Sequence, residues 1–201
     1  EYMASELSKL DEYRKNFISN ISHDFRSPLT SIKGYLEAML DGTIPPDKYD
    51  KYLNIVLSES KRLTKLTTGL LELNDFDNYG PILKTSSFDL LDIFNSVTLT
   101  FEKVANDKHI TFDISNSAST SIVVADKTKI TQVIYNLVDN ALKFSSANST
   151  IYISLSEKND KLFVSVKDQG TGIKKESQNK VWERFYKTDP SRGKDKQGTG
   201  L

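Results

Sequence analysis

Apolar residues in the first 77 positions recur every three, four or seven residues, which is the spacing of one face of an α-helix. One such stripe covers residues 3–39 and a second covers residues 49–73. Between them, Gly42 suits the C-terminus of a helix, and Pro45 and Pro46 cannot extend the helix before them. The pattern therefore predicts two long antiparallel helices joined by a turn.

Each predicted helix carries a single apolar stripe, and two helices alone would leave that stripe half exposed. A second copy of the hairpin would cover it in a four-helix bundle. We therefore expect a homodimer through the helical bundle. The alternative is a monomer whose stripe is covered by other domains.

Beyond residue 87 the pattern changes to short strand-like runs that alternate with helical spacing. Helices are predicted for 88–106, 128–144 and 177–186, and strands for 110–114, 122–124, 150–156 and 161–166. This order is typical of an α/β sandwich with helices on one face of a mixed sheet. The expected fold class is thus α+β, with a helical hairpin over 1–77, a linker over 78–87 and an α/β sandwich domain over 88–201.

The composition excludes several classes of protein. Lys plus Arg and Asp plus Glu balance at 27 each, so no overall charge attracts nucleic acid or an anionic membrane. The chain has no cysteine, which excludes disulfides and thiolate chemistry. No stretch approaches the roughly 20 apolar residues that cross a bilayer. Any anion that binds must therefore be held by a local site.

His23 is the residue of chemical interest on the first predicted helix. It lies two positions from both Ile21 and Phe25 of the apolar stripe, about 200° round the helix axis from each, and so faces away from the stripe. A neutral imidazole nitrogen is a nucleophile at physiological pH. Adjacent Asp24 can accept the other ring N–H or take up a proton. Alone, His23 would be an ordinary solvated histidine, but the surrounding segment 17–29, FISNISHDFRSPL, favours a reactive one.

A second candidate site lies on the helix predicted for 128–144. Asn136 and Asn140 are four residues apart and share a face, and Lys143 follows three positions later. Amide oxygens can ligate Mg²⁺, which also takes oxygens from substrate phosphates, and a lysine offsets negative charge. The pattern predicts a site for a polyphosphate with its Mg²⁺. The alternative is a solvated helix face, of which paired asparagines are also typical.

The segment 168–172, DQGTG, directly follows a predicted strand. Its glycines, Gly170 and Gly172, permit a close backbone approach to a ligand. Asp168 supplies an acceptor suited to an exocyclic amine such as adenine N6. A plain turn is the alternative.

A polar, charged and glycine-bearing loop over 189–197 leads to Gly198 and Gly200. Such a loop could close over a bound nucleotide. Neither a Walker A motif nor a Rossmann fingerprint is present, which excludes the common phosphate-loop folds.

In their order and spacing, the segments around His23, Asn136, Asp168 and Gly198 resemble the H, N, G1 and G2 boxes of two-component sensor histidine kinases. The run 181–187, VWERFYK, is similar to the F box of that family. The resemblance covers nearly the whole chain. It implies a dimerisation and phosphotransfer hairpin followed by a Bergerat-type ATP-binding domain.

The resemblance also implies a role for each matching residue. His23 would be the phosphoacceptor and Asp24 its general base. Asn136 would ligate Mg²⁺, and Asn140 and Lys143 would contact the phosphates of ATP. The remaining matches would line the nucleotide pocket and its lid: Asp168 at the adenine amine, Gly170 and Gly172 beside it, Phe185 and Tyr186 anchoring the lid, and Gly198 and Gly200 at the phosphate end.

The activity implied is autophosphorylation of His23 by ATP, followed by transfer to an aspartate of a response-regulator receiver domain that docks on the bundle. The resemblance leads us to expect a cytoplasmic segment of a parent protein anchored in the plasma membrane. This segment itself is expected to contact neither nucleic acid nor membrane.

Two departures from the family pattern qualify these expectations. The G2 box of the family continues beyond Leu201, so we expect the ATP-binding domain to be incomplete at its C-terminus. Ser27 stands where the family often has threonine; it keeps a hydroxyl that could orient water but lacks the methyl that restricts the rotamer. Phosphatase activity toward the partner is therefore a secondary expectation.

Three questions stay open at the level of sequence. The same ATP fold could drive an ATPase conformational machine, although such a protein has no use for His23. A dimeric scaffold without catalysis is the non-enzymatic alternative. The residue types also leave open whether phosphoryl transfer occurs within one subunit or across the dimer.

Overall fold

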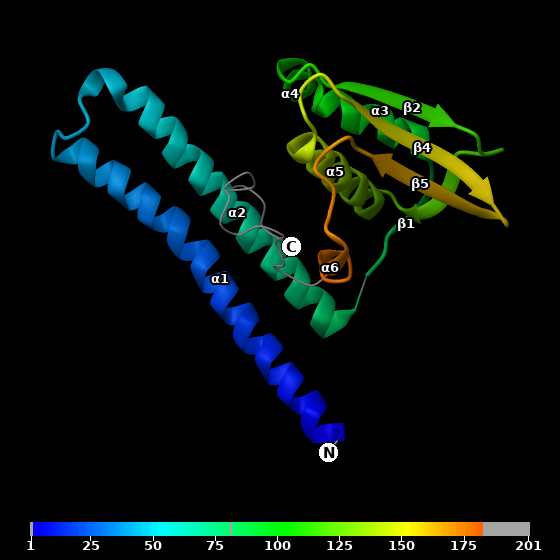
Figure 1. Ribbon diagram of the computed structural model, residues 1–201, viewed down its shortest axis with the longest axis horizontal. Coiled ribbons are helices and arrows are strands. Elements are labelled where there is room, and N and C mark those ends of the chain that lie inside the picture. The colour runs from blue at the N-terminus through cyan, green and yellow to red at the C-terminus, as the bar shows by residue number, and fades with distance from the viewer. Residues whose placement is uncertain (1, 81, 183–201) are drawn as a thin grey trace. The chain divides into compact units, whose positions relative to one another are not determined.

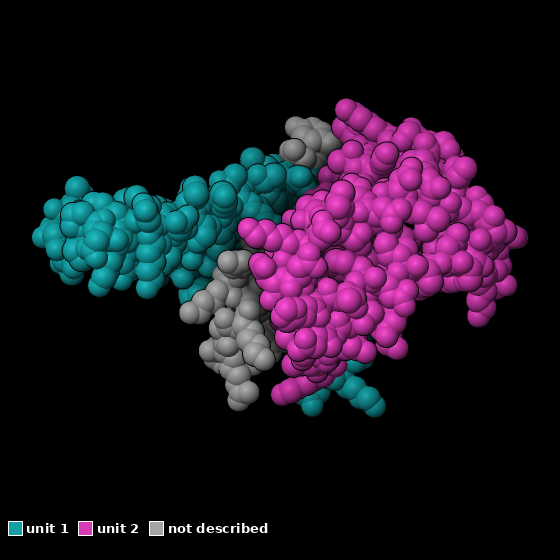
Figure 2. All heavy atoms as spheres, turned by 90° about the horizontal axis from the view of Figure 1, so that it is seen from above, with its two compact units in different colours: residues 1–80, 175–201 teal, residues 81–174 magenta. Residues whose placement is uncertain are grey.

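The computed structural model describes residues 2–80 and 82–182, and the contacts between residues divide the chain into two compact units. One unit consists of residues 1–80 and 175–201, and the other of residues 81–174 (Figure 2). The first is a helical hairpin and the second an α/β domain, which confirms the predicted fold class. The expectations for Phe185, Tyr186, Gly198 and Gly200 lie outside the described residues.

The hairpin consists of α1 (Tyr2–Leu40) and α2 (Tyr49–Tyr79), which run antiparallel (Figure 1). Gly42 has a φ of 79°, a left-handed conformation that favours glycine, and the Ile44 amide donates to the Ala38 carbonyl at 2.7 Å. A short 3₁₀ helix, η1 (Pro46–Lys48), then precedes α2. The predicted pair of helices and the turn between them are confirmed.

Among the described side chains, from residue 17 onward, the apolar stripes of α1 and α2 face each other inside the hairpin. Leu66 is fully buried, and Met39 and Ile44 are almost so. The rings of Tyr35 and Tyr52 lie 5.3 Å apart between their centroids. Other large apolar side chains of the same helices remain exposed: Ile18, Leu29, Leu36, Leu40, Leu53, Leu57, Leu71 and Phe76. The contacts within one hairpin therefore bury only part of its apolar surface.

The second unit contains two sheets. Strands β1 (Thr85–Asp89) and β3 (Ile122–Asp126) form an antiparallel pair. Strands β2 (Thr111–Asn116), β4 (Thr150–Lys158) and β5 (Lys161–Lys167) form a mixed sheet in the order β2-β4-β5, in which β2 and β4 are parallel and β4 and β5 antiparallel. The expected mixed sheet is thus present, with β1 and β3 as a separate ribbon.

The helices of this unit are α3 (Leu90–Thr100), α4 (Glu102–Asp107) and α5 (Lys127–Phe144). Helices α3 and α5 share one hydrophobic core with β4. Its members include Phe94, Val138 and Ile153, none of which is measurably exposed. Burial of apolar side chains between the helices and the sheet is the main contribution to the stability of the unit.

Two predicted helices differ from the structure. The segment 88–106 is divided: Phe88 belongs to β1, and Asp89 caps α3 by accepting a hydrogen bond from the Leu91 amide at 2.8 Å. Apolar spacing alone does not show that a strand passes directly into a helix, whereas a capping aspartate does. Of the helix predicted for 177–186, the described part forms only the short α6 (Lys175–Gln178).

Candidate functional site

His23 stands on the solvent face of α1, as its position relative to the stripe predicts. Its side chain is 82% exposed, whereas that of Asp24 is 12% exposed, and His23 Nδ1 lies 3.6 Å from Asp24 Oδ1. This separation is too long for a hydrogen bond, so the two groups are neighbours without being bonded in this structure. Because Asp24 lies on the Nδ1 side, Nε2 is the ring nitrogen left to meet an incoming group.

The helix continues through Pro28, which is fully buried in the hairpin one turn beyond Asp24. Proline has no backbone N–H, so position 28 cannot donate the usual helical hydrogen bond to the Asp24 carbonyl. The turn around His23 therefore lacks one internal hydrogen bond. Ser27 is exposed, four residues after His23 and therefore on the same side of the helix. The structure thus brings His23 and the Ser27 hydroxyl to one surface.

The second candidate site is built on α5, whose N-terminus is fixed by Asp126. The Asp126 carboxylate accepts hydrogen bonds from the Lys84 amide at 2.9 Å and from the Lys129 amide at 3.1 Å. These donors, Lys84 first, hold the pKa of Asp126 below its ordinary value. Asp126 therefore joins the start of α5 to the segment that precedes β1.

Asn136 and Asn140 are both exposed on α5, one turn apart, so their amides are accessible to a ligand. Lys143 is half-buried, and its Nζ donates to Asp139 Oδ2 at 2.7 Å. Asp139 was not among the predicted site residues, although its spacing of four residues before Lys143 is typical of a helical ion pair. In this structure the ammonium group is held along the helix by Asp139.

Gly170 lies against the C-terminus of α5. Ser145 and Gly170 form an isolated antiparallel bridge, and a Cβ at position 170 would lie 2.5 Å from the Phe144 carbonyl oxygen. The Gly170 amide donates to Asp168 Oδ1 at 2.8 Å, which orients the carboxylate. Gly170 therefore lies close to the protein's own backbone, and this contact brings Asp168 near the end of the helix that carries Asn136.

Gly172 differs from Gly170. It has a φ of 66°, and a Cβ there would meet no atom within 4 Å. Its conformation, rather than crowding, is what favours glycine. The predicted nucleotide residues of the described chain, from Asn136 to Gly172, thus all belong to the second unit, whereas His23, Asp24 and Ser27 belong to the first.

Two family models match the chain. Residues 13–78 match the His Kinase A (phospho-acceptor) domain, and residues 125–201 match the histidine kinase-, DNA gyrase B- and HSP90-like ATPase. The first range contains His23, and the second contains all the predicted nucleotide residues. The two matches correspond to the hairpin and to most of the α/β domain.

Known histidine kinases resemble the chain in sequence and in structure. The sensor histidine kinase WalK of Bacillus subtilis is 34% identical over 204 residues, which cover 100% of this chain and 33% of WalK. The histidine kinase ThkA in complex with the response regulator protein TrrA is 29% identical, with a TM-score of 0.73 over 91% of this chain and 56% of that one. The catalytic domain of ThkA is 31% identical, with a TM-score of 0.51 over 58% of this chain and 73% of that domain.

The chain therefore belongs to the two-component sensor histidine kinases, and it contains a phosphoacceptor hairpin followed by an ATP-binding domain of that family. It spans about a third of the length of the curated relatives that it matches. None of the described helices is long and apolar enough to cross a membrane.

Proposed function

We propose that this chain transfers the γ-phosphoryl group of ATP to Nε2 of His23 and then passes it to an aspartate of a response-regulator receiver domain. The observation that carries the proposal is an exposed histidine held beside a buried carboxylate, in a chain that also has the ATP-binding domain of the kinase family. Exposure lets His23 meet a donor carried by another unit. The neighbouring carboxylate can accept the Nδ1–H and stabilise the positive charge that the ring gains on attack.

In the second unit, Asp168 binds the exocyclic amine of adenine, and the amide oxygens of α5 face the phosphates. Asn136 supplies a ligand to Mg²⁺, which fits a site of few protein oxygens because this ion draws much of its coordination from phosphates and water. When bound, Mg²⁺ offsets the charge of the phosphates. Asn140 contacts the phosphates, and Lys143 reaches them by exchanging its contact with Asp139.

Radiolabel transfer tests this proposal. The chain is incubated with Mg²⁺ and γ-labelled ATP beside two variants, His23→Gln and the matched control His109→Asn. His109 is exposed with a φ of 54°, a conformation that asparagine also adopts. We expect acid-labile, alkali-stable label on the wild type and on His109→Asn, and none on His23→Gln.

The other outcomes discriminate between the alternatives. Label that persists in His23→Gln would identify a different acceptor. A wild type that binds ATP without becoming labelled would favour an ATPase machine, if free phosphate is released, or a scaffold, if it is not. Omitting Mg²⁺ should abolish the label, and Asn136→Ala should raise the Mg²⁺ concentration that labelling requires.

The exposed apolar residues of α1 and α2 support a homodimer in which two hairpins form a four-helix bundle. The ThkA–TrrA complex supports a response regulator as the phosphoryl acceptor, which would dock on the bundle around His23. In this proposal the segment is cytoplasmic and belongs to a longer sensor kinase that is anchored in the plasma membrane. Sedimentation of the chain at micromolar concentration tests the dimer.

A second activity is carried by Ser27. Its exposed hydroxyl lies one helical turn from His23 and can orient a water molecule toward a phosphoaspartate on the docked regulator. Ser27→Ala should retain autophosphorylation of His23 but lose dephosphorylation of the regulator. Equal loss of both activities would instead indicate a structural role for this serine.

A further inference from the structure

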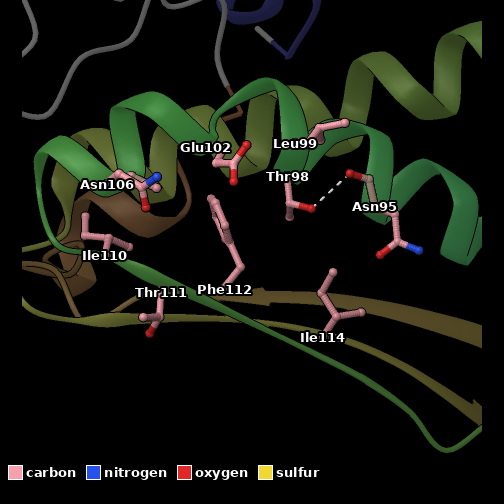
Figure 3. A pocket seen from close by; sticks show the side chains of 10 residues that line it. Asn95, Thr98, Leu99, Glu102, Asn106, Ile110, Thr111, Phe112 and Ile114 are labelled. Atoms are coloured by element: carbon pink, nitrogen blue, oxygen red, sulfur yellow. Dashed lines mark hydrogen bonds between the residues drawn. The ribbon is translucent and has the colours of Figure 1, made fainter.

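The α/β domain has a groove of about 440 Å³ between the α3–α4 layer and strand β2 (Figure 3). Its lining residues are Asn95, Thr98, Leu99, Glu102, Ala105, Asn106, Ile110, Thr111, Phe112 and Ile114. None of them comes from α5 or from the segment 168–172. The groove is therefore separate from the candidate nucleotide site, and the proposed kinase reaction does not account for it.

One wall of the groove is an edge strand. Among the described strands, β2 pairs only with β4, and none of them pairs with its other edge. The amides of Thr111 and Ser117 donate to the carbonyls of Ser149 and Leu155, which fixes the odd-numbered amides of this segment toward β4. Because backbone amides along a strand point alternately to its two edges, the amides of Phe112 and Ile114 point away from β4, toward the edge without a described partner.

The position of the groove matches what an additional strand would need. The groove is lined by α3 and α4 on one side and by β2 on the other, so that a strand added beside β2 would lie with one face toward these helices (Figure 3). Phe112 and Ile114 turn toward these helices and pack partly against the core, and Leu99 is 69% exposed at the groove. Apolar side chains of an added strand would cover Leu99 and extend the core.

The charges select the chemistry of the occupant. Glu102 is the one charged residue that lines the groove, and Figure 3 shows its side chain directed from α4 toward the strand. Within the described part of the chain it has no ion-pair partner. Asp113 alternates with Phe112 and Ile114, and so lies on the opposite face of the sheet, where it is exposed. A strand beside β2 would therefore meet one acidic group on each of its faces.

A second copy of the chain is a poor occupant of this edge. The sequence of β2, TFDISN, contains no basic residue, and pairing two β2 strands would bring acidic groups of both copies together. Like charges on neighbouring strands are destabilising, and charge is a common device against edge-to-edge association. A strand that carries lysine or arginine is favoured instead.

We propose that the free edge of β2 and the adjoining groove bind an extended segment of a partner protein by strand addition, with apolar and basic side chains on the groove side of the segment and a basic one on its outer face. Backbone hydrogen bonds to Phe112 and Ile114 supply affinity, and the acidic groups select the sequence. This surface lies outside the residues that we assign to phosphoryl transfer.

A designed peptide tests the proposal on the full chain. The probe is Thr-Val-Lys-Arg-Thr-Val-Thr with blocked ends, which places the valines and arginine toward the groove and lysine on the outer face. The control peptide has glutamate in place of both basic residues. Binding is measured by NMR titration together with amide hydrogen exchange. We expect slowed exchange at the amides of residues 112 and 114, and roughly tenfold weaker binding of the control peptide.

The variants make the test specific. Glu102→Lys should weaken binding of the probe about tenfold, whereas the same charge change at Glu37, 61% exposed on α1, should leave it unchanged. If both variants lost binding of the probe equally, the effect would be due to overall charge, and that result would overturn the proposal. So would an absence of binding at millimolar probe, or binding that leaves the exchange of these two amides unaltered. Protection that appears on concentrating the protein alone would instead identify a second copy as the occupant.

Discussion

Substituting Gly170 by alanine tests the contact between the segment 168–172 and the end of α5. The added Cβ would lie 2.5 Å from the Phe144 carbonyl oxygen, 2.9 Å from its carbonyl carbon and 2.8 Å from Asp168 Oδ1. Ordinary contacts between such atoms are about 3.5 Å, so the backbone must separate by about 1 Å. The two nearest backbone atoms belong to the end of a helix and cannot rotate away.

We expect Gly170→Ala to lower the free energy of unfolding of the α/β domain by about 1–3 kcal/mol, the usual cost of overpacking. Displacing Asp168 by about 1 Å should also weaken ATP binding by a factor of roughly 10 to 100. Thermal unfolding by circular dichroism measures the first effect, and titration with a fluorescent ATP analogue measures the second.

Position 172 supplies the matched controls. Gly172→Ala meets no atom but must adopt a positive φ, which costs about 1–2 kcal/mol, whereas Gly172→Asn should be close to the wild type because asparagine tolerates this conformation. Gly170→Asn should be at least as damaging as Gly170→Ala, since crowding rather than φ decides there. A Gly170→Ala protein with the melting temperature and ATP affinity of the wild type would refute the reasoning.

Three further substitutions test the hairpin, the proposed base and the cap of α5. Leu66→Ala removes a fully buried side chain of α2 and should cost about 2–5 kcal/mol in urea unfolding; a cost below about 1 kcal/mol would mean that the hairpin repacks. Asp24→Asn should lower the rate of His23 labelling by roughly 10²–10⁴ while ATP affinity stays unchanged; an unchanged rate would exclude Asp24 as the base. The stabilising effect of ionised Asp126 is present above its unfolded pKa, near 3.8, and is lost as the pH falls through the lower pKa of the folded state. Asp126→Asn should therefore show a shallower loss of stability as the pH falls below 3.8, and a slope equal to that of the wild type would contradict this role.

The helical hairpin could be predicted from sequence because its determinants are local. The apolar spacing along α1 and α2 repeats over many turns, Gly42 follows the end of α1, and Pro46 begins the short 3₁₀ helix that leads into α2. The exposure of His23 followed from the same spacing, since a residue opposite a buried stripe must face away from it. Pro28 is a competing signal in the interior of α1, but the helix continues through it.

The details of the candidate nucleotide site could not be predicted in the same way, because they depend on contacts between distant segments. Nothing near Gly170 in sequence indicates that Phe144 will lie against it. Lys143 was expected to be available to phosphates, but in the structure its ammonium group is paired with Asp139. The pairing does have a local signal, because Asp139 lies four residues before Lys143 on the same helix.

The pattern of burial fits the proposed reaction, in which His23 and the candidate nucleotide site belong to different units. Asp24 is held in the hairpin while His23 beside it is 82% exposed, and on α5 the core face is buried while Asn136 and Asn140 are exposed. Buried neighbours fix the orientation of each reactive group, and exposure lets one group meet the other. Since neither unit contains both the proposed donor site and His23, the rate of autophosphorylation must depend on how often the units meet as well as on the chemistry of each. Substitutions in segment 80–84, between α2 and β1, should therefore alter the labelling of His23 without altering ATP affinity.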